Sequence, residues 1–281
     1  ASTDVTIKAY YQTEAGETER EIEGFVPQVV EATYGKEYEP KPLAIEGYTQ
    51  VGSNLTNGKI MVKDPATLKP GEEANVVKFY FTKDKGNVTY RAVVKGATGD
   101  GSDDLVVWSK DLTVNKGTAP ETTVNDGDTQ IPPILKNYMI KGNGNPTITR
   151  KDGQPAATYD GVHELYVTYE YEQKTVPVTI KAINVLTNTE INLPADQASK
   201  TLATGETHTI YAPTLDGYKT LGTGSVSYSL DADTQNPSVT FFYMPSEKAE
   251  VAVTLYYTTG DNGEQKQTIQ VLRSETEWDN T

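Results

Sequence analysis

Residues 5–13 read VTIKAYYQT, a stretch in which apolar and polar side chains alternate as they do along a half-buried strand. Val5, Ile7 and Ala9 fall on one face of such a strand, and the residues between them fall on the other. The pattern recurs as VTYRAVVKG from Val88, VTIKAINVL from Val178 and VTLYYTTGD from Val253. Repetition at intervals of 83, 90 and 75 residues predicts a chain built from similar β modules.

A second strand-like stretch, rich in aromatic and β-branched residues, closes each repeat. It reads VVKFYF at residues 76–81, LYVTYEY at 165–171 and SVTFFY at 238–243. A polar, charged segment follows each stretch, as is typical of a connection between domains. We therefore predict repeats at residues 1–84, 85–173 and 174–247, with residues 248–281 as a partial fourth repeat or an extra hairpin on the third.

The middle of each repeat carries a motif in which glycine or asparagine precedes tyrosine. It reads IEGYTQVG at residues 45–52, LKNYMIKG at 135–142 and LDGYKTLG at 215–222. Glycine adopts a positive φ freely and asparagine is its best substitute, so we predict this conformation at Gly47, Asn137 and Gly217.

The tyrosine that follows should begin a strand with its ring toward the core, which makes it a marker of the fold and not a ligand-binding residue. These tyrosines are Tyr48, Tyr138 and Tyr218. A proline in the preceding segment predicts an edge or irregular strand. These prolines are Pro40, Pro132 and Pro213. Helix signals are weak: residues 64–77 could hold one turn and residues 195–203 two, so the fold class is mainly β.

Composition narrows the classes of function. The 281 residues carry a net charge of −14, which argues against nucleic acid and against an anionic membrane surface as partners. The chain has no cysteine, so disulfides and thiolate chemistry are excluded. No stretch approaches the ~20 apolar residues that span a bilayer, so no membrane insertion is expected. The first residues have no basic and apolar leader, so we expect a mature fragment if the parent protein is exported.

The sequence offers little for catalysis or metal binding. Its two histidines, His163 and His208, lie in different repeats and are interpreted as surface or strand-edge residues. No pair of carboxylates sits in a glycosidase motif. The loop TGDGSDDL (residues 98–105) places Asp100, Ser102 and Asp104 at alternate positions, the ligand rhythm of a calcium loop. The alternative for this segment is an acidic hairpin loop, and we predict neither a metal nor a cofactor.

Two further groups of residues have competing interpretations. Lys8 and Lys181 occupy equivalent strand positions, as a lysine of an intramolecular isopeptide bond would, but repeat two has Arg91 there. Aromatic side chains could stack on sugars, although alternating tyrosines also build small β cores and we favour that role. The candidates for stacking are Tyr10, Tyr11, Trp108, Tyr169, Tyr171, Tyr256 and Tyr257.

Taken together, these residues resemble the MucBP-type (mucin-binding protein) repeats of Gram-positive surface adhesins. Repeat one matches that pattern through Gly35, Tyr38, Pro40, Gly47, Tyr48 and Gly52. Repeat three matches through Gly205, Pro213, Gly217, Tyr218 and Gly222, with His208 in place of the first tyrosine. Repeat two departs further, with Asn137 for glycine and a long segment at residues 98–121.

The resemblance implies β-grasp (ubiquitin-like) modules of α+β type, arranged as a tandem elongated array of three small modules plus a partial fourth. It also implies an extracellular protein attached to the cell wall, with adhesion to mucin glycans in some members and plain spacing in others. No LPxTG sorting motif occurs in the sequence, so we expect the anchor to lie outside this fragment.

We therefore expect a monomeric, non-enzymatic fragment of a cell-surface protein with no catalytic residues and with ligand-binding residues that the sequence does not identify. Its expected role is adhesion to an extracellular glycan or host surface protein through weak, repeated modules. The alternative is a structural stalk that projects a distal domain from the cell wall. An accessory domain of a wall-acting enzyme is a third class.

Overall fold

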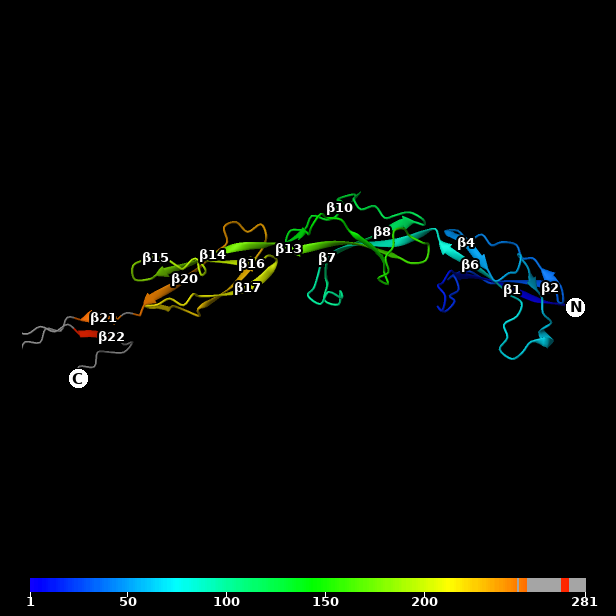
Figure 1. The fold of residues 1–281 in the computed structure, drawn as a ribbon, viewed down its shortest axis with the longest axis horizontal. Helices are drawn as coiled ribbons and strands as arrows, with labels where there is room; N and C mark the ends of the chain where they lie inside the picture. Colours follow the sequence, from blue (N-terminus) through cyan, green and yellow to red (C-terminus); the bar gives the residue numbers. More distant parts are fainter. Residues whose placement is uncertain (247, 252–268, 273–281) are drawn as a thin grey trace, which may run out of the picture. The chain divides into compact units, whose positions relative to one another are not determined.

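The computed structural model describes residues 1–246, 248–251 and 269–272, which form strands joined by turns and loops (Figure 1). Two units make up the chain: Ala1–Ile134 with Ile140–Glu172, and Leu135–Met139 with Gln173–Thr281. In the described part the only helical segment is the 3-10 turn η1 (Pro65–Thr67), where Asp64 accepts a hydrogen bond from the Ala66 N–H at 3.0 Å. None of the described helical structure is long and apolar enough to cross a membrane.

The first sheet lies in unit 1 and has the strand order β2-β1-β6-β4. Its strands are β1 (Ser2–Tyr11), β2 (Gln28–Thr33), β4 (Tyr48–Ser53) and β6 (Val76–Lys83). A separate antiparallel pair is formed by β3 (Glu37–Tyr38) and β5 (Ile60–Met61), which precede and follow β4 in the sequence. The predicted alternation along β1 is confirmed, because Val5, Ile7 and Ala9 are all buried in one core cluster.

The second sheet has the order β11-β13-β7-β8, with β12 also pairing with β13. Its strands are β7 (Lys85–Val94), β8 (Leu105–Asn115), β11 (Tyr138–Ile140), β12 (Thr147–Arg150) and β13 (Leu165–Gln173). A short hairpin is formed by β9 (Val124–Asp126) and β10 (Thr129–Ile131).

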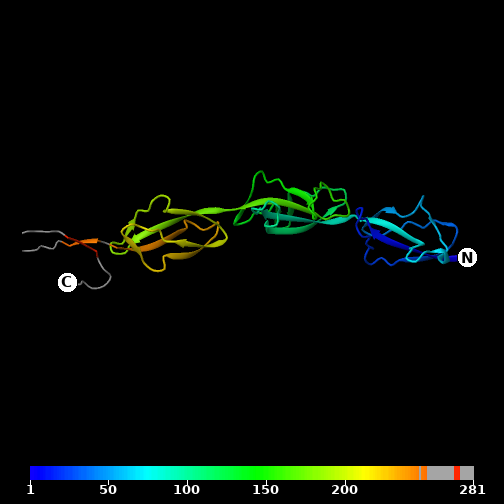
Figure 2. The same cartoon turned by 60° about the horizontal axis from the view of Figure 1, so that its bottom comes forward.

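The third sheet has the order β15-β14-β20-β18, with β16 also pairing with β14, and Figure 2 shows β14 running beside the orange β20. Its strands are β14 (Thr175–Asn184), β15 (Thr189–Ile191), β16 (Ser199–Ala203), β18 (Tyr218–Thr220) and β20 (Ser238–Pro245). Strands β17 (Glu206–Tyr211) and β19 (Ser225–Leu230) form a pair in the same unit.

The three sheets share one central feature, a parallel pair flanked by antiparallel strands. The pairs are β1 with β6, β7 with β13, and β14 with β20. In each pair an alanine faces an aromatic residue: Ala9 and Phe79, Ala92 and Tyr169, Ala182 and Phe241. Since neighbouring strands lie only about 4.8 Å apart, a small residue beside each ring lets the core close.

The predicted role of the motif tyrosines as strand starts is confirmed. Tyr48, Tyr138 and Tyr218 are the first residues of β4, β11 and β18. Each of these side chains is half-buried, and those of Tyr48 and Tyr218 pack against core clusters. The prediction of helix at residues 195–203 is wrong. The Pro194 carbonyl accepts hydrogen bonds from Gln197 and Ala198, which makes a single turn, and β16 then carries Leu202 into the core.

Buried tyrosines fill much of the second core and use their hydroxyls to hold loops. Tyr90 donates to the Glu121 carbonyl at 2.8 Å, and Tyr171 donates to the Pro133 carbonyl at 2.5 Å. Tyr169 donates to the carbonyl of Thr122. A buried hydroxyl without a partner would be costly, so these bonds let tyrosine serve as a core residue.

We expect the fold to be lost at alkaline pH. Burial raises the pKa of Tyr159 and of Tyr169 to about 12, whereas an unfolded tyrosine titrates near pH 10. Because the folded-state pKa is the higher one, these groups contribute stability that is complete below pH ~10 and is lost as the pH rises through about 12. Tyrosinate absorbance and circular dichroism should therefore change together in this range. Titration of every tyrosine near pH 10 with the sheets intact would contradict the expectation.

Only part of the predicted fourth repeat or extra hairpin at residues 248–281 is described. Strand β21 (Lys248–Val251) pairs antiparallel with β22 (Ile269–Leu272). The candidate tyrosines Tyr256 and Tyr257 lie outside the described residues.

Candidate functional site

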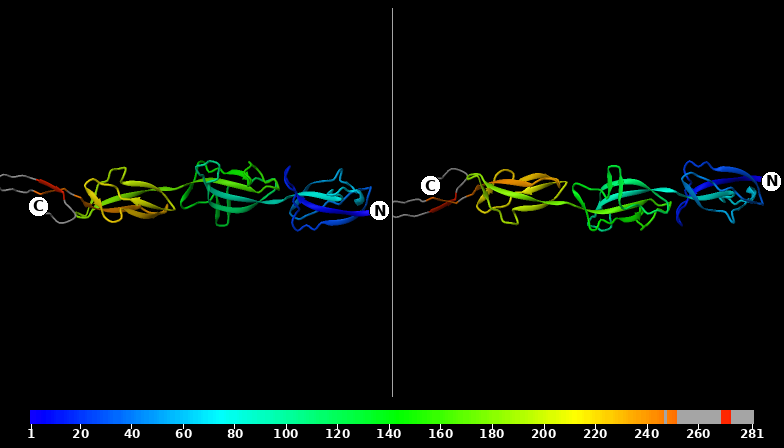
Figure 3. Two further views of the ribbon diagram at one scale, coloured as in Figure 1. Left: turned by 90° about the horizontal axis from the view of Figure 1, so that it is seen from below. Right: turned by 90° about the horizontal axis from the view of Figure 1, so that it is seen from above.

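The first and second sheets of unit 1 follow each other without a loop, because only Asp84 separates β6 from β7 (Figure 3). Both backbone groups of Asp84 are engaged. Its N–H donates to the Gly47 carbonyl at 2.9 Å, and its carbonyl accepts from the Lys116 N–H at 2.8 Å. Gly47 lies just before β4 of the first sheet and Lys116 just after β8 of the second, so the linker is held from both sheets.

A close backbone approach reinforces this junction. The Lys83 N–H donates to the Gly161 carbonyl at 2.8 Å. Gly161 is buried with φ +89°, and a Cβ atom added there would lie 2.6 Å from Thr82 Cβ. The Lys116 Nζ also donates to the Thr82 hydroxyl at 2.6 Å. Only glycine therefore fits between the end of β6 and the segment before β13.

Unit 2 repeats the arrangement around Lys174, the single residue between β13 and β14. The Lys174 N–H donates to the Asn137 carbonyl at 2.9 Å, and the Lys174 carbonyl accepts from the Thr204 N–H at 2.9 Å. After β20, the Ser246 N–H likewise donates to the Gly217 carbonyl at 2.8 Å. The residue before each motif tyrosine thus supplies a carbonyl to the residue that follows the last strand of its repeat.

The predicted positive φ is confirmed at Gly47 and Gly217, whose φ values are +79° and +77°. It is wrong for Asn137, which is not among the residues with positive φ. Asparagine serves a different purpose here, because its side chain binds a neighbouring loop. The Ala232 N–H donates to Asn137 Oδ1 at 3.0 Å, and Lys136 pairs with Asp231 at 3.1 Å.

A groove of about 970 Å³ lies in unit 1 beside the Asp84 junction. Its lining includes the ends of β1 and β6, the start of β7, and residues 159 and 161–164. Part of its wall is the Tyr159 ring, which packs so closely on Gly86 that an added Cβ would lie 2.2 Å from a ring carbon. The groove is therefore shaped by packed residues of the junction.

Three cations line this groove without a carboxylate partner among the described residues: Arg20, Lys83 and Lys85. Arg20 Cζ lies 4.6 Å and Lys83 Nζ 5.4 Å from the centroid of the Tyr11 ring, so both make cation–π contacts. The Tyr11 hydroxyl lies 3.4 Å from that of Tyr48. This contact and burial raise the pKa of Tyr48 to about 12.

The loop after β1 is tied to the second sheet by charge. Glu14 Oε1 pairs with Arg150 at 2.7 Å and lies 3.6 Å from His163 Nε2. His163 Nδ1 in turn contacts Asp160 at 2.6 Å. His208, in unit 2, contacts the Ala203 carbonyl through Nε2 at 2.7 Å. Each histidine therefore contacts residues of its own unit.

Three of the four described tyrosines singled out for sugar stacking lie in the core. Tyr10, Tyr169 and Tyr171 are 6%, 1% and 3% exposed, so none offers a free ring face to a ligand. Trp108 is half-buried on β8, the edge strand of the second sheet. Tyr11 is half-buried as well and is the only described candidate that lines the groove.

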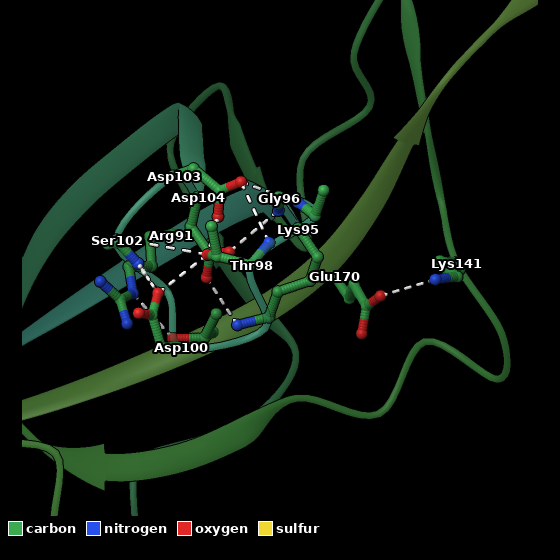
Figure 4. A network of polar contacts seen from close by, with 12 residues as sticks. Arg91, Lys95, Gly96, Thr98, Asp100, Ser102, Asp103, Asp104, Lys141 and Glu170 are labelled. Atoms are coloured by element: carbon green, nitrogen blue, oxygen red, sulfur yellow. Dashed lines mark hydrogen bonds and ion pairs between the residues drawn. The ribbon is translucent and has the colours of Figure 1, made fainter.

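The acidic loop at residues 96–104 closes on itself through hydrogen bonds (Figure 4). The Asp104 carboxylate accepts from Lys95 Nζ at 2.7 Å, and Asp100 accepts from the Ser102 N–H at 2.9 Å. Hydrogen bonds from Ser102 and Thr98 lower the pKa of Asp100 to about 2. Across the described ranges, no group of three or more His, Asp or Glu side chains could hold a metal ion. The loop joins the antiparallel strands β7 and β8, so it is a hairpin connection.

The lysines considered for isopeptide bonds lie on the polar face of their strands. Lys8 Nζ pairs with Glu21 at 2.8 Å, and Lys181 is exposed. Arg91 at the equivalent position stacks on Tyr166, with Cζ 3.8 Å from the ring centroid. Lys8 and Arg91 therefore make ordinary surface contacts in this structure.

Sequence reasoning missed both the carbonyl role of the motif residue and the groove. A signal for the first was present, since the two strand stretches at each repeat boundary leave almost no chain between them. No local signal pointed to the groove, because it joins residues from both ends of the first repeat with residues of the second.

Comparison with known proteins gives the following results. No family model matches the chain, and no curated protein matches it. Among solved structures the chain is similar to Mub-RV, with 13% identity, 58% of this chain and 100% of that chain covered, and a TM-score of 0.20. A type 2 repeat of the mucus binding protein MUB from Lactobacillus reuteri has 12% identity, coverages of 86% and 99%, and a TM-score of 0.20. The shaft pilin SpaA from Lactobacillus rhamnosus GG has 12% identity, coverages of 88% and 98%, and a TM-score of 0.16. TM-scores of 0.20 and below assign no function to this chain.

Proposed function

We propose that the chain is a non-enzymatic segment of an extracellular surface protein of a Gram-positive bacterium, and that it acts as a stalk. In this proposal residues 1–84, 85–173 and 174–247 are MucBP-like β-grasp modules, and the cell-wall anchor lies elsewhere in the parent protein. The observation that carries the proposal is the held one-residue linker at Asp84 and again at Lys174.

A linker of this kind suits a spacer. A flexible linker would leave its backbone groups to water and would let neighbouring modules reorient freely. At Asp84 both the N–H and the carbonyl are bonded to protein groups, and at Lys174 the same two bonds recur. The Asp84 linker therefore contributes two hydrogen bonds, about 0.5–1.5 kcal/mol apiece, to holding one orientation of the first and second sheets within unit 1.

Adhesion by every module, the role expected first from the sequence, has less support. It requires an exposed aromatic or polar patch that recurs in at least two modules. Tyr10, Tyr169 and Tyr171 are buried, and the Tyr11 position is occupied by Val94 and Asn184 in the other two sheets. The resemblance to MucBP-type repeats still makes mucin the first macromolecule to screen for binding.

The stalk proposal can be tested with distance measurements within unit 1. The chain has no cysteine, so Thr33→Cys with Ser109→Cys gives one label pair on exposed positions of the first and second sheets. Spin-label distances should form one narrow distribution. Inserting Gly-Ser between Asp84 and Lys85 should broaden it, because the two backbone bonds of Asp84 can no longer form together with both strands.

A matched insertion provides the control. The same two residues placed between Pro70 and Gly71, in the exposed loop before β6, should leave the distribution narrow. If the unmodified chain already gives a distribution as broad as that of the Asp84 insertion, the linker does not fix orientation and the stalk proposal fails.

A further inference from the structure

Tyr11 and Tyr48 bring two phenol groups into contact at one end of the first sheet. Tyr11 is the last residue of β1 and Tyr48 the first of β4, and these two strands lie on either side of β6. The two hydroxyl oxygens are 3.4 Å apart, and the ring centroids are 6.0 Å apart with an interplanar angle of 54°. The oxidatively reactive carbons of a tyrosine ring are the two next to its hydroxyl, so contact between the hydroxyls also brings these carbons close together.

The surroundings of this pair hold the rings in place and leave them open to solvent. Both side chains pack against the first core cluster, and both are half-buried. Arg20 Cζ and Lys83 Nζ lie 4.6 Å and 5.4 Å from the centroid of the Tyr11 ring, which restricts its movement. Tyr11 also lines the groove of about 970 Å³, so solvent reaches it. Holding two reacting groups side by side raises their effective concentration and favours their reaction with each other.

Two other tyrosine pairs among the described residues have ring contacts, and each includes a buried ring. Tyr10 is 6% exposed, and its neighbour Tyr80 donates its hydroxyl to Glu19 at 2.6 Å. Tyr243, the neighbour of Tyr218, is fully buried and donates its hydroxyl to a backbone carbonyl at 2.7 Å. In neither pair do the two hydroxyls meet, so the pair at the end of β1 is the one arranged for reaction between its rings.

We propose that Tyr11 and Tyr48 form an intramolecular dityrosine cross-link when a haem peroxidase with hydrogen peroxide acts on the chain. Each phenol loses one electron and one proton, which leaves a phenoxyl radical whose unpaired electron is shared with the ring carbons next to the oxygen. The two radicals couple through one such carbon each, and the hydrogen atoms on those carbons move to the oxygens, which restores both hydroxyls. The peroxide accepts the two electrons and the two protons and becomes two molecules of water.

The cross-link gives the first repeat a covalent staple in a chain that has no cysteine for a disulfide. Tyr11 and Tyr48 are 37 residues apart in the sequence, so the new bond closes a long loop and removes conformations from the unfolded state. Small domains bury too little surface to be highly stable without such a constraint. This inference does not depend on the stalk role, because both tyrosines lie in the same sheet.

The test treats the full chain, at low concentration, with a haem peroxidase and an equimolar amount of hydrogen peroxide. We expect a monomer that is lighter by two hydrogen atoms and shows dityrosine fluorescence. Tandem mass spectrometry of its tryptic fragments should find Tyr11 joined to Tyr48. The first sheet of the cross-linked chain should also unfold at a higher urea concentration than that of the untreated chain, as followed by amide exchange in β1 and β6.

Two phenylalanine variants separate this pair from tyrosine oxidation in general. Tyr48→Phe keeps the ring in the core but removes the hydroxyl that the radical requires, so the lighter monomer should be lost. Tyr218→Phe is the matched control, because Tyr218 holds the same motif position in the third repeat and contacts the buried Tyr243, so it should leave the yield unchanged. An undiminished yield from Tyr48→Phe, a main product linked at Tyr10 and Tyr80, or no lighter monomer at all would overturn the proposal.

Discussion

Replacing Gly161 by alanine is expected to destabilise unit 1 and to loosen its junction. The new Cβ would lie 2.6 Å from Thr82 Cβ, closer than real Cβ contacts allow, and 3.2 Å from the Lys83 carbonyl oxygen, which is a tight contact. Backbone atoms cannot rotate away as the end of a long side chain can. The hydrogen bond from Lys83 to Gly161 should therefore lengthen, and overpacking of this kind costs about 1–3 kcal/mol.

The control for this substitution is Gly153→Ala. Gly153 has φ +93°, close to the +89° of Gly161, and an added Cβ there meets no atom within 4 Å. Both variants suffer the same backbone strain, so the difference between their urea midpoints measures the steric contact alone. Amide exchange at Lys83 should accelerate only in Gly161→Ala. Equal urea midpoints for the two variants would mean that unit 1 accommodates the added Cβ at position 161 without loss of stability, and would contradict the prediction.

The strands were predictable from the sequence because each one is a local pattern. The alternation of Val5, Ile7 and Ala9 is sufficient to place β1, and the tyrosine after glycine marks where β4 and β18 begin. The prediction of a helix at residues 195–203 was wrong because helical propensity is a local property and does not include pairing with a distant strand. Residues 199–203 form β16, which pairs with β14 and buries Leu202.

The junction and the groove were beyond local reasoning for a different physical reason. The Gly47 carbonyl finds its donor 37 residues further along, at Asp84, and no periodicity encodes that distance. Asn137 is a second residue whose role depends on a long-range contact. Sequence alone suggests an asparagine that imitates glycine through positive φ, whereas its side chain in fact binds the Ala232 N–H. Long-range hydrogen bonds decide the role of a residue whose local preference allows several.

Replacing Tyr243 by alanine is expected to give the largest loss of stability in unit 2. The ring is fully buried at the end of β20, packs edge-on against Tyr218 at a centroid distance of 6.4 Å, and donates its hydroxyl to the Pro213 carbonyl at 2.7 Å. Removing a buried aromatic ring costs about 3–5 kcal/mol, a large fraction of the stability of a small domain. Hydrogen exchange should accelerate in β14 and β20 while β1 and β6 remain protected.

Tyr243→Phe separates the ring from its hydroxyl. The same register position holds Phe81 in the first sheet and Tyr171 in the second, so the fold accepts a ring without a hydroxyl there. The phenylalanine variant should lose only the bond to Pro213, about 1 kcal/mol. If it were as unstable as the alanine variant, the hydroxyl and not the ring would hold the loop that carries the Gly217 carbonyl. Because that carbonyl accepts from Ser246, the polar bond would then determine the geometry at the end of β20.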